Sequence, residues 1–482
     1  MSERPAEDVL DTSRAGGLVI RGSALRVGGY ALGTVLGVIA SAILLRHLGV
    51  EGAGRYTTVI SLLAIVSGLT DAGLVNIGVR EFSTRGGAAR WEVMRDLLGL
   101  RLALAAAGVL LAVGFAVLAG YTEAMIAGTA LGGVGVLLIG AYGAFAIPLS
   151  AGLRLGAVTV LELLRNALSA VLLGGLALAG AGLVPLLAVP VPVGAVLMVA
   201  AYLLVRGEMP WRPSIALRRW RVLLADVLPY AMATAVGFIY VYLTVILLGF
   251  VADDREVGLF SAAFRVFIVL AGASGLLAQT AFPVLARAAR DDSARLTYGT
   301  QRLLEGSFIV AAVAGLGIGF AAPVAIDVVA GGGEFDGAVG VLELQAIAFA
   351  GTFPAAVAGF AVLAQGRYRA VLAANGAALV VSLVVTLALA SAKGAAVANI
   401  AGELVLLGGY VAALCSGPDR MHLRLGLMPR AWLAAALGTV AGLLTPGPSL
   451  VRTAAALAVF GVVLLAVRGL PDEIRQALLR RA

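Results

Sequence analysis

"YTTVISLLAIVSGLTDAGLVNIGVRE", residues 56–81, begins as an apolar run and ends on an Arg–Glu pair. About 20 consecutive apolar residues are enough for a helix to cross the hydrocarbon core of a bilayer. Similar runs recur from one end of the chain to the other, without the alternation of polar and apolar residues that membrane barrel strands need. The sequence therefore predicts an all-α polytopic membrane protein.

The composition supports this class and excludes several others. Of 482 residues, 61% are hydrophobic and 13% are charged, whereas about a quarter of an ordinary soluble domain is charged. One cysteine, Cys415, and two histidines leave no disulfide and no His/Cys metal cluster. Lys393 is the only lysine and a glycine follows it, so the sequence lacks a nucleotide-binding P-loop. We expect no cofactor, no metal and no enzymatic activity.

Charged and Gly/Pro-rich joints divide the chain into about fourteen predicted spans. With the N-terminus inside, the interior joints collect most of the 35 basic residues, while the exterior joints are acidic or neutral. This positive-inside bias predicts that both termini are cytoplasmic, and it explains the net charge of +8 without a nucleic-acid partner. The predicted spans are 23–45, 56–79, 97–118, 124–146, 157–179, 183–205, 227–250, 257–284, 303–329, 338–364, 370–390, 394–414, 431–445 and 450–467.

The longest interior joint, "RGEMPWRPSIALRRWR" (206–221), predicts a boundary between two bundles. Its arginines, prolines and tryptophans are typical of a segment that lies at the headgroup level. The predicted parts are a cytoplasmic tail (1–22), an N-terminal six-helix bundle (23–205), an interfacial linker (206–226), a C-terminal six-helix bundle (227–414), and two further helices with an amphipathic cytoplasmic tail (415–482).

An internal repeat supports that boundary. "LGVEGAGRY" (48–56) follows the first span and "LGFVADDREVGLF" (248–260) follows the seventh, and each places a glycine and an aromatic residue at the start of the next helix. Both halves have the same predicted orientation, which indicates a pseudo-two-fold axis along the membrane normal.

Two stretches carry a resemblance to a known family: "LLRHLGVEGAGRYTTVISLLAIVSGLTDAGLVNIGVREFS" (44–83) and "LLGFVADDREVGLFSAAFRV" (247–266). They resemble the polysaccharide-transporter family of lipid-linked oligosaccharide flippases, within the multidrug/oligosaccharidyl-lipid/polysaccharide superfamily. The small-residue turn "GGGEFDGAVGVLELQAI" (331–347) adds a third match. The matching residues of the first stretch are Leu48-Gly49, Gly54-Arg55-Tyr56, Asp71-Ala72-Gly73-Leu74 and Arg80-Glu81.

The resemblance implies two six-helix bundles that face each other across a central cavity and move by alternating access. It also implies a cytoplasmic-membrane location and a polyprenyl-pyrophosphate-linked oligosaccharide as substrate, with membrane lipids and polysaccharide polymerase machinery as partners. One departure concerns the seventh span, where relatives often carry an arginine and an aspartate. Tyr242 and Thr244 stand there in this chain, so a role for that charged pair does not transfer.

Arginines within the spans are the predicted ligands of an anionic headgroup, because a guanidinium can bind phosphate oxygens bidentately. Arg265 lies about a third of the way into the eighth span, on one helical face with Ser261, Gly272 and Gln279. Its alternative role is to snorkel or to pair with a carboxylate. Arg26, near the inner end of the first span, either meets the phosphates or anchors the helix.

Acidic residues within spans are the second group of candidates, since ionisable side chains at membrane depth are costly. Glu403, with Asn399 one turn away, is predicted either to couple an ion or to hydrogen-bond a neighbouring helix. Glu162 and Arg165 form a stripe that either lines a cavity or neutralises itself as an ion pair. Asp71 either takes part in ion coupling or orients the second helix, where we expect it to face the bundle interior with Asn76.

The preferred hypothesis is a flippase for a lipid-linked oligosaccharide. A cation-coupled multidrug antiporter of the same superfamily and a non-transporting membrane scaffold are the alternatives. A hydrated cationic cleft favours the first hypothesis, a cavity lined by carboxylates and aromatic residues favours the second, and fully paired charges without a cavity favour the third.

Overall fold

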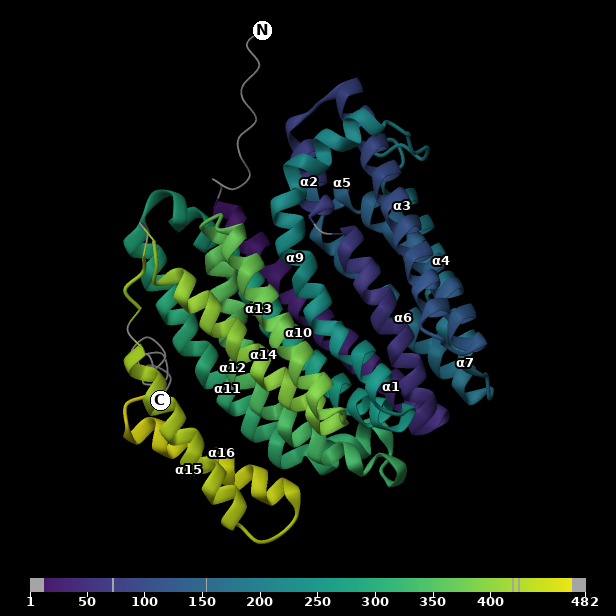
Figure 1. Cartoon of the computed structure of the whole chain (residues 1–482). Coiled ribbons are helices and arrows are strands. Elements are labelled where there is room, and N and C mark those ends of the chain that lie inside the picture. The colour runs from purple at the N-terminus through teal and green to yellow at the C-terminus, as the bar shows by residue number, and fades with distance from the viewer. Residues whose placement is uncertain (1–12, 72, 153, 418–419, 424, 470–482) are drawn as a thin grey trace. The chain divides into compact units, whose positions relative to one another are not determined.

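The computed structural model describes residues 13–71, 73–152, 154–417, 420–423 and 425–469 (Figure 1). The regular elements of this part of the chain are helices. They are α1 Ser13–Asp71, α2 Leu74–Thr84, α3 Gly87–Leu118, α4 Glu123–Phe145, α5 Ile147–Ala151, α6 Leu155–Leu178, α7 Leu183–Leu187, α8 Pro190–Val205, α9 Leu217–Val251, α10 Asp254–Asp291, α11 Ser293–Ala330, α12 Gly337–Ala364, α13 Tyr368–Leu389, α14 Ala392–Leu414, α15 Met428–Leu444 and α16 Ser449–Ala466, with short 3-10 turns at Gly333–Phe335 and Leu425–Leu427.

Twelve helical segments of the described chain are long and apolar enough to cross a membrane, and Met428–Leu444 is a shorter apolar helix. The first segment, Ala31–Thr84, contains 54 residues and covers two predicted spans. A straight helix of that length would measure about 80 Å, well over the thickness of a bilayer. Gly49 interrupts this helix with a positive φ of 66°. The helices and candidate spans together confirm the predicted all-α polytopic fold.

Two predicted spans lie within candidate membrane spans of the structure, and each contains a break in its helix. The span 56–79 divides into α1 and α2 at Gly73, whose φ of 86° is left-handed and favours glycine. The span 183–205 divides into α7 and α8, and Pro190 opens the second helix. Proline has no N–H to donate within a helix, but it suits the first helical turn.

The packing groups the chain into two compact units. The first comprises residues 1–44 and 73–227, and the second comprises residues 45–72 and 228–482. The segment 45–72, which contains the second half of α1, therefore packs with the C-terminal helices.

Within the first unit, α4 packs against α3 and α8, and α2 packs against α5. Close approaches occur at small residues: a Cβ at Gly78 would lie 2.4 Å from a side-chain atom of Ile147, and a Cβ at Gly128 would lie 2.2 Å from one of Leu187. Phe145 anchors a cluster of rings with Tyr202 and Trp211, at centroid distances of 5.4 and 6.0 Å.

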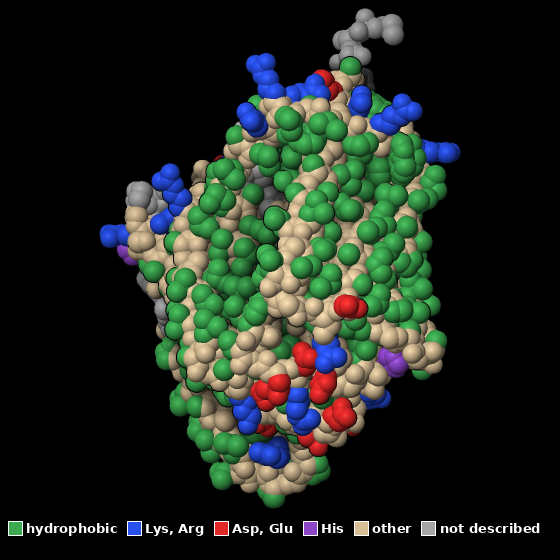
Figure 2. Space-filling view, turned by 45° about the vertical axis from the view of Figure 1, so that its right-hand side comes forward, with side chains coloured by type: hydrophobic (Ala, Val, Ile, Leu, Met, Phe, Trp, Pro, Cys, Tyr) green, Lys and Arg blue, Asp and Glu red, His purple; other side chains and the backbone are tan. Residues whose placement is uncertain are grey.

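Within the second unit, α12 is the central helix and packs against α10, α11 and α14. Phe349 on α12 is fully buried and stacks on Phe267 of α10 at 5.1 Å. The two C-terminal helices, α15 and α16, form a pair that packs on α11 (Figure 1). Figure 2 shows hydrophobic side chains along the lengths of the helices on the face in view, with charged side chains gathered at the helix ends.

Candidate functional site

Arg265 lies on α10 between the N-cap Asp253 and the helix centre, and its side chain is half-buried. It is within electrostatic range of the hydroxyls of Tyr56, on the second half of α1, and Tyr242, on α9. The Tyr242 ring packs edge-on against Phe264 at 6.3 Å. Two phenol groups that can donate to an anion therefore lie within electrostatic range of this guanidinium.

The other residues predicted on the Arg265 face differ in burial. Ser261 is buried and donates to the carbonyl of Val257, whereas Gly272 and Gln279 are exposed. Helical spacing brings these residues onto one side of α10, but neighbouring helices cover only part of that side. Arg26 lies on α1, and its side chain falls outside the described residues.

The two copies of the internal repeat lie against each other in the second unit. A Cβ at Gly54 would be 2.4 Å from the carbonyl oxygen of Asp254, and a Cβ at Gly258 would be 2.0 Å from the carbonyl oxygen of Val50. Only glycine lets the two backbones approach this closely. The Arg55 guanidinium also binds the Asp254 carboxylate at 2.7 Å. The repeated glycines thus have a packing function that sequence inspection alone did not reveal.

Further polar contacts join the same segment to the turn after α11. Arg46 donates to the carbonyls of Asp327 and Val328 at 2.9 and 3.1 Å. The Val50 N–H donates to Glu334 Oε2 at 3.4 Å. The predicted outer end of the second unit is therefore joined by hydrogen bonds, by an ion pair and by direct backbone packing.

Glu403 on α14 is almost fully buried and accepts a 3.1 Å hydrogen bond from the Tyr240 hydroxyl of α9. Two glycines create the space around this carboxylate. A Cβ at Gly351 of α12 would lie 2.8 Å from the Glu403 side chain, and a Cβ at Gly402 would lie 2.7 Å from the Tyr240 hydroxyl. The carboxylate is thus enclosed between three helices and held by a phenol group.

Two amides have buried side-chain atoms without a hydrogen-bond partner among the described residues: the Asn399 nitrogen and both polar atoms of the Gln345 side chain. They belong to α14 and α12, which also meet at Gly351 and Glu403. Buried polar groups are normally satisfied by protein or water. Sequence reasoning identified Asn399 but missed Gln345, because a glutamine beside "VLEL" gives no sign of which face it occupies.

The predicted stripe on α6 belongs to the first unit. Glu162 is half-buried and Arg165 is exposed, and the ion pairs of the described chain do not include one between them. Each lies within electrostatic range of the Tyr142 hydroxyl on α4. Asn166 packs against α1, since a Cβ at Gly33 would be 2.3 Å from its amide nitrogen.

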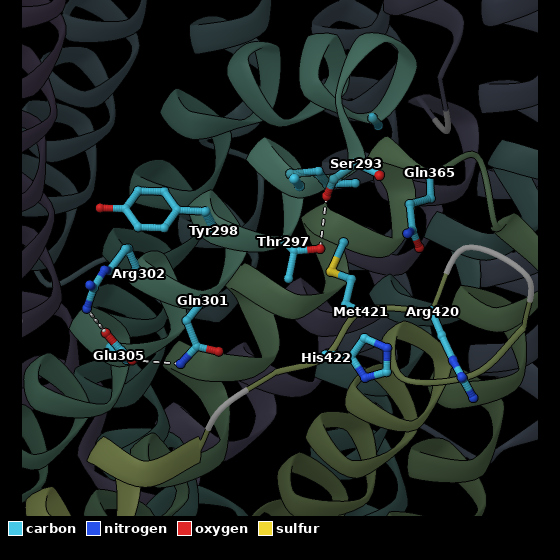
Figure 3. Close-up of a pocket in the computed structure, with 13 residues that line it drawn as sticks. Ser293, Thr297, Tyr298, Gln301, Arg302, Glu305, Gln365, Arg420, Met421 and His422 are labelled. Atoms are coloured by element: carbon cyan, nitrogen blue, oxygen red, sulfur yellow. Dashed lines mark hydrogen bonds and ion pairs between the residues drawn. The ribbon is translucent and has the colours of Figure 1, made fainter.

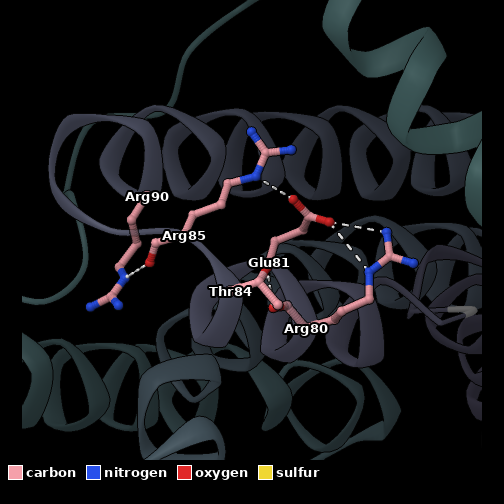
Figure 4. Close-up of polar contacts among 5 residues, drawn as sticks. All are labelled: Arg80, Glu81, Thr84, Arg85 and Arg90. Atoms are coloured by element: carbon pink, nitrogen blue, oxygen red, sulfur yellow. Dashed lines mark hydrogen bonds and ion pairs between the residues drawn. The ribbon is translucent and has the colours of Figure 1, made fainter. Parts of the chain in front are cut away.

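The polar residues of the opening stretch have separate environments. Asp71 ends α1 and is half-buried, while Asn76 on α2 is exposed, so the expectation that Asn76 faces an interior is wrong. The buried carboxylate of the stretch is Glu81, which accepts hydrogen bonds from Arg80 at 3.0 Å and from Arg85 (Figure 4). Two guanidiniums compensate this carboxylate at the helix end.

A second compensated carboxylate was missed by sequence reasoning. Asp96 on α3 is 1% exposed and binds Arg219 of α9 at 2.6 Å, while Glu92 on the exposed side binds the same guanidinium. Hydrogen bonds and charge from Asp96 and Glu92 raise the pKa of Arg219 above its ordinary value. The interfacial linker is thereby fastened to α3 within the first unit.

Comparison with solved structures places the fold among membrane transporters. A structure described as "Lipid II flippase MurJ, inward closed conformation" matches with a TM-score of 0.74 at 11% identity, covering 92% of this chain and 99% of that chain. A MATE structure in complex with MaL6 matches with a TM-score of 0.60 at 16% identity, covering 82% and 94%. A MOP superfamily transporter from Pyrococcus furiosus matches with a TM-score of 0.54 at 16% identity, covering 82% and 95%.

No curated protein sequence matches the chain. The sequence profile of the family described as "Polysaccharide biosynthesis protein" matches residues 19–289, which is more than half of the chain and includes both copies of the repeat. The chain therefore belongs to the polysaccharide biosynthesis protein family.

Proposed function

We propose that the protein is a flippase that moves a polyprenyl-pyrophosphate-linked oligosaccharide across the cytoplasmic membrane by alternating access, for cell-envelope or exopolysaccharide biosynthesis. The observation that carries the proposal is Arg265, a half-buried guanidinium in a helix apolar enough to span a membrane. Ionisable residues at membrane depth commonly mark substrate pathways. Membership of a polysaccharide biosynthesis family supports a glycan-linked substrate.

The proposed substrate presents two problems, its pyrophosphate charge and its sugars, neither of which enters hydrocarbon. Arg265 would bind the phosphate oxygens through parallel N–H donors, and the hydroxyls of Tyr56 and Tyr242 would add neutral donors. Arg26, Arg165 and Gln279 are the further proposed contacts of the polar headgroup. The polyprenyl tail needs no protein pathway because it is soluble in the bilayer.

Alternating access requires each unit to move without losing its own packing. The contacts of Gly54 and Gly258 and the Arg55–Asp254 ion pair lie within the second unit, and their proposed part is to hold its predicted outer end together as it moves. The cytoplasmic location of both termini, inferred from the distribution of arginine, is part of this proposal.

The energy source we propose is an ion gradient that acts through Glu403 and Asn399. An uncompensated negative charge is costly in a buried site. A buried carboxylate is therefore stabilised when it binds a proton or a small cation. The Gln345 carbonyl on α12, a buried oxygen without a hydrogen-bond partner among the described residues, is a further proposed ligand. Asp71 and Glu162 are second-choice coupling residues, since both are only half-buried.

Depletion of the protein tests the substrate class most simply. We expect a lipid-linked oligosaccharide to accumulate in the inner leaflet, and its chemical identification would name the glycan. The buried Glu403 also fits a cation-coupled antiporter of small drugs. That alternative predicts drug sensitivity on depletion without a lipid-linked intermediate, and a scaffold predicts neither. If the protein also partners with polysaccharide polymerase machinery, it should co-purify with the polymerase proteins that act on the identified glycan.

A further inference from the structure

Gln345 on α12 and Asn399 on α14 carry buried amide atoms that the described side chains do not satisfy. Gln345 is 0% exposed and Asn399 is 5% exposed. The nitrogen and the oxygen of the Gln345 side chain, and the nitrogen of Asn399, have no hydrogen-bond partner among the described residues. A buried polar atom left unpaired costs more than an ordinary hydrogen bond contributes, so a stable fold supplies a partner for these three atoms.

The polar pocket at the start of α11 shows how other polar side chains of the second unit are satisfied. In this pocket, of about 810 Å³, Gln301 donates a 2.6 Å hydrogen bond to Glu305 (Figure 3). Arg420 on its wall is exposed, so water can reach the guanidinium. Gln345 and Asn399 have neither a protein partner for these atoms nor an exposed surface.

Two contacts fix how α12 and α14 lie against each other. A Cβ at Gly351 would lie 2.8 Å from the Glu403 side chain, and a Cβ at Gly359 would lie 2.9 Å from the Tyr410 ring. The two helices are therefore parallel, and residues at the same level differ in number by 51 or 52. Gln345 is then level with residues 396–397, so it lies about 4 Å from Asn399 along the helix axes.

Both amides lie on helix faces that meet at Glu403. Asn399 is one turn before Glu403 on the same side of α14. Gln345 is two turns before Thr352 on the same side of α12, and the Thr352 hydroxyl lies within hydrogen-bonding range of Glu403. Both helices begin at the predicted outer end, so the two amides lie on the predicted outer side of the carboxylate.

The chemistry of the unpaired atoms selects water over a bare cation. The Asn399 nitrogen is a donor and needs an acceptor, whereas the Gln345 carbonyl oxygen needs a donor. A water molecule between them accepts from the nitrogen, donates to the oxygen and keeps a second O–H for Glu403. A cation would satisfy the oxygen and leave the donor unpaired.

We propose that Gln345 and Asn399 hold bound water through which Glu403 takes up and releases a proton, so that the coupling ion is a proton. An excess proton on this water passes along the hydrogen bond to a Glu403 oxygen. The carboxylate becomes a neutral carboxyl group and the water molecule is regenerated. The two amides act as positioning residues for the water.

This inference rests on the proposed coupling role of Glu403. The titratable groups that interact with Glu403 in the described chain are the phenols of Tyr240 on α9 and Tyr410 on α14. Phenols ionise only near pH of about 10 in water, so the carboxyl group is the one that changes charge at neutral pH.

Infrared spectroscopy of the purified full chain in detergent tests the proposal without a transported substrate. At acidic pH the protonated Glu403 gives a carboxyl C=O band that Glu403→Gln removes, and transfer into D2O shifts this band as the proton exchanges. We expect Gln345→Leu and Asn399→Leu each to slow the exchange at least tenfold, because each removes a hydrogen bond to the relaying water. Tyr410→Phe, on the predicted inner side of Glu403, should leave the exchange rate unchanged.

The double variant shows whether both amides hold the same water. Gln345→Leu combined with Asn399→Leu should then slow exchange no further than either single variant, whereas independent effects would multiply to about a hundredfold. Thermal unfolding gives a second readout. Gln345→Leu should lower Tm because it removes a partner of the bound water, whereas replacing an amide that binds nothing by a leucine of similar size would raise Tm.

Four results would overturn the proposal: unchanged exchange in both single variants, equal slowing by Tyr410→Phe, multiplied effects in the double variant, or a raised Tm in Gln345→Leu. Lipid transport driven by a sodium gradient and not by a pH gradient would overturn the proton assignment and leave the flippase proposal intact. The expected exchange pattern in a protein that moves no lipid would support the bound water and contradict only the flippase proposal.

Discussion

The Tyr240 hydroxyl donates a 3.1 Å hydrogen bond to Glu403, and both side chains are almost completely buried in the second unit. A carboxylate buried between helices is expensive unless its oxygens have donors. The phenol therefore both stabilises the charged form and fixes the direction in which the carboxylate points. The proposed ion coupling depends on this pair.

Tyr240→Phe should lower the free energy of unfolding by about 1–3 kcal/mol, because it leaves a buried acceptor without its donor. Thermal unfolding in detergent measures the loss. Tyr202→Phe is the matched control: its half-buried ring packs against Phe145 and Trp211, and we expect a change below about 0.5 kcal/mol. Equal stability of Tyr240→Phe and wild type would contradict the claim that this hydrogen bond stabilises the fold.

Glu403→Gln should retain the fold, because an amide is nearly isosteric with a carboxylate and can still accept from Tyr240. We expect transport to lose its dependence on the coupling ion while substrate binding persists. Transport in vesicles, with and without an imposed ion gradient, separates these effects. A variant that still responds fully to the gradient would exclude Glu403 from coupling.

The contact between the two repeats is sensitive to a single methyl group. Gly258→Ala would place a Cβ 2.0 Å from the Val50 carbonyl oxygen and Gly54→Ala one 2.4 Å from the Asp254 carbonyl oxygen. Each should destabilise the protein by about 1–3 kcal/mol because backbone must move. Gly376→Ala, where a Cβ meets nothing within 4 Å, should be neutral or stabilising by up to about 1 kcal/mol. A neutral Gly258→Ala would contradict the packing.

Arg219 binds one buried carboxylate, Asp96, and one exposed carboxylate, Glu92. The stability lost on removing each carboxylate can therefore be compared within one protein. Asp96→Ala should destabilise by about 1–3 kcal/mol, since it removes the buried partner and also the acceptor of Ser214. Glu92→Ala should change stability by less than about 0.5 kcal/mol, as exposed pairs contribute little. Thermal unfolding of both variants measures the difference, and similar values would contradict it.

The predicted orientation is testable with the single natural cysteine. Cys415 is exposed and free at the end of α14, at a predicted cytoplasmic position. A membrane-impermeant maleimide should label it in inverted vesicles and not in intact cells. In a Cys415→Ser background, Glu123→Cys at an exposed, predicted outer position should show the opposite pattern. Labelling of Cys415 from outside would reverse the assigned topology.

Hydropathy predicted the helical segments well because long apolar runs have few alternatives in a bilayer. It did not predict the breaks at Gly73 and Pro190, which depend on backbone conformation at one residue. The repeat was visible in sequence, yet the direct packing of Gly54 on the start of α10 was not.

Individual polar residues were harder to interpret than the helices that carry them. Sequence reasoning placed Asn76 inside, whereas Glu81 is the buried carboxylate of that stretch. Neither Gln345 nor Asp96 was identified, because the partner of a buried polar group comes from a helix distant in sequence. Helix face and partner are tertiary information, which periodicity in one sequence carries only weakly.

The central claim is that Arg265 binds the anionic headgroup of a transported lipid. The most direct measurement is translocation of a fluorescent polyprenyl-pyrophosphate oligosaccharide by purified protein in liposomes. The account predicts that Arg265→Ala inserts normally and loses at least tenfold in rate, whereas Arg255→Ala, exposed in the first turn of the same helix, retains it. An Arg265→Ala protein that transports at the wild-type rate would contradict the account.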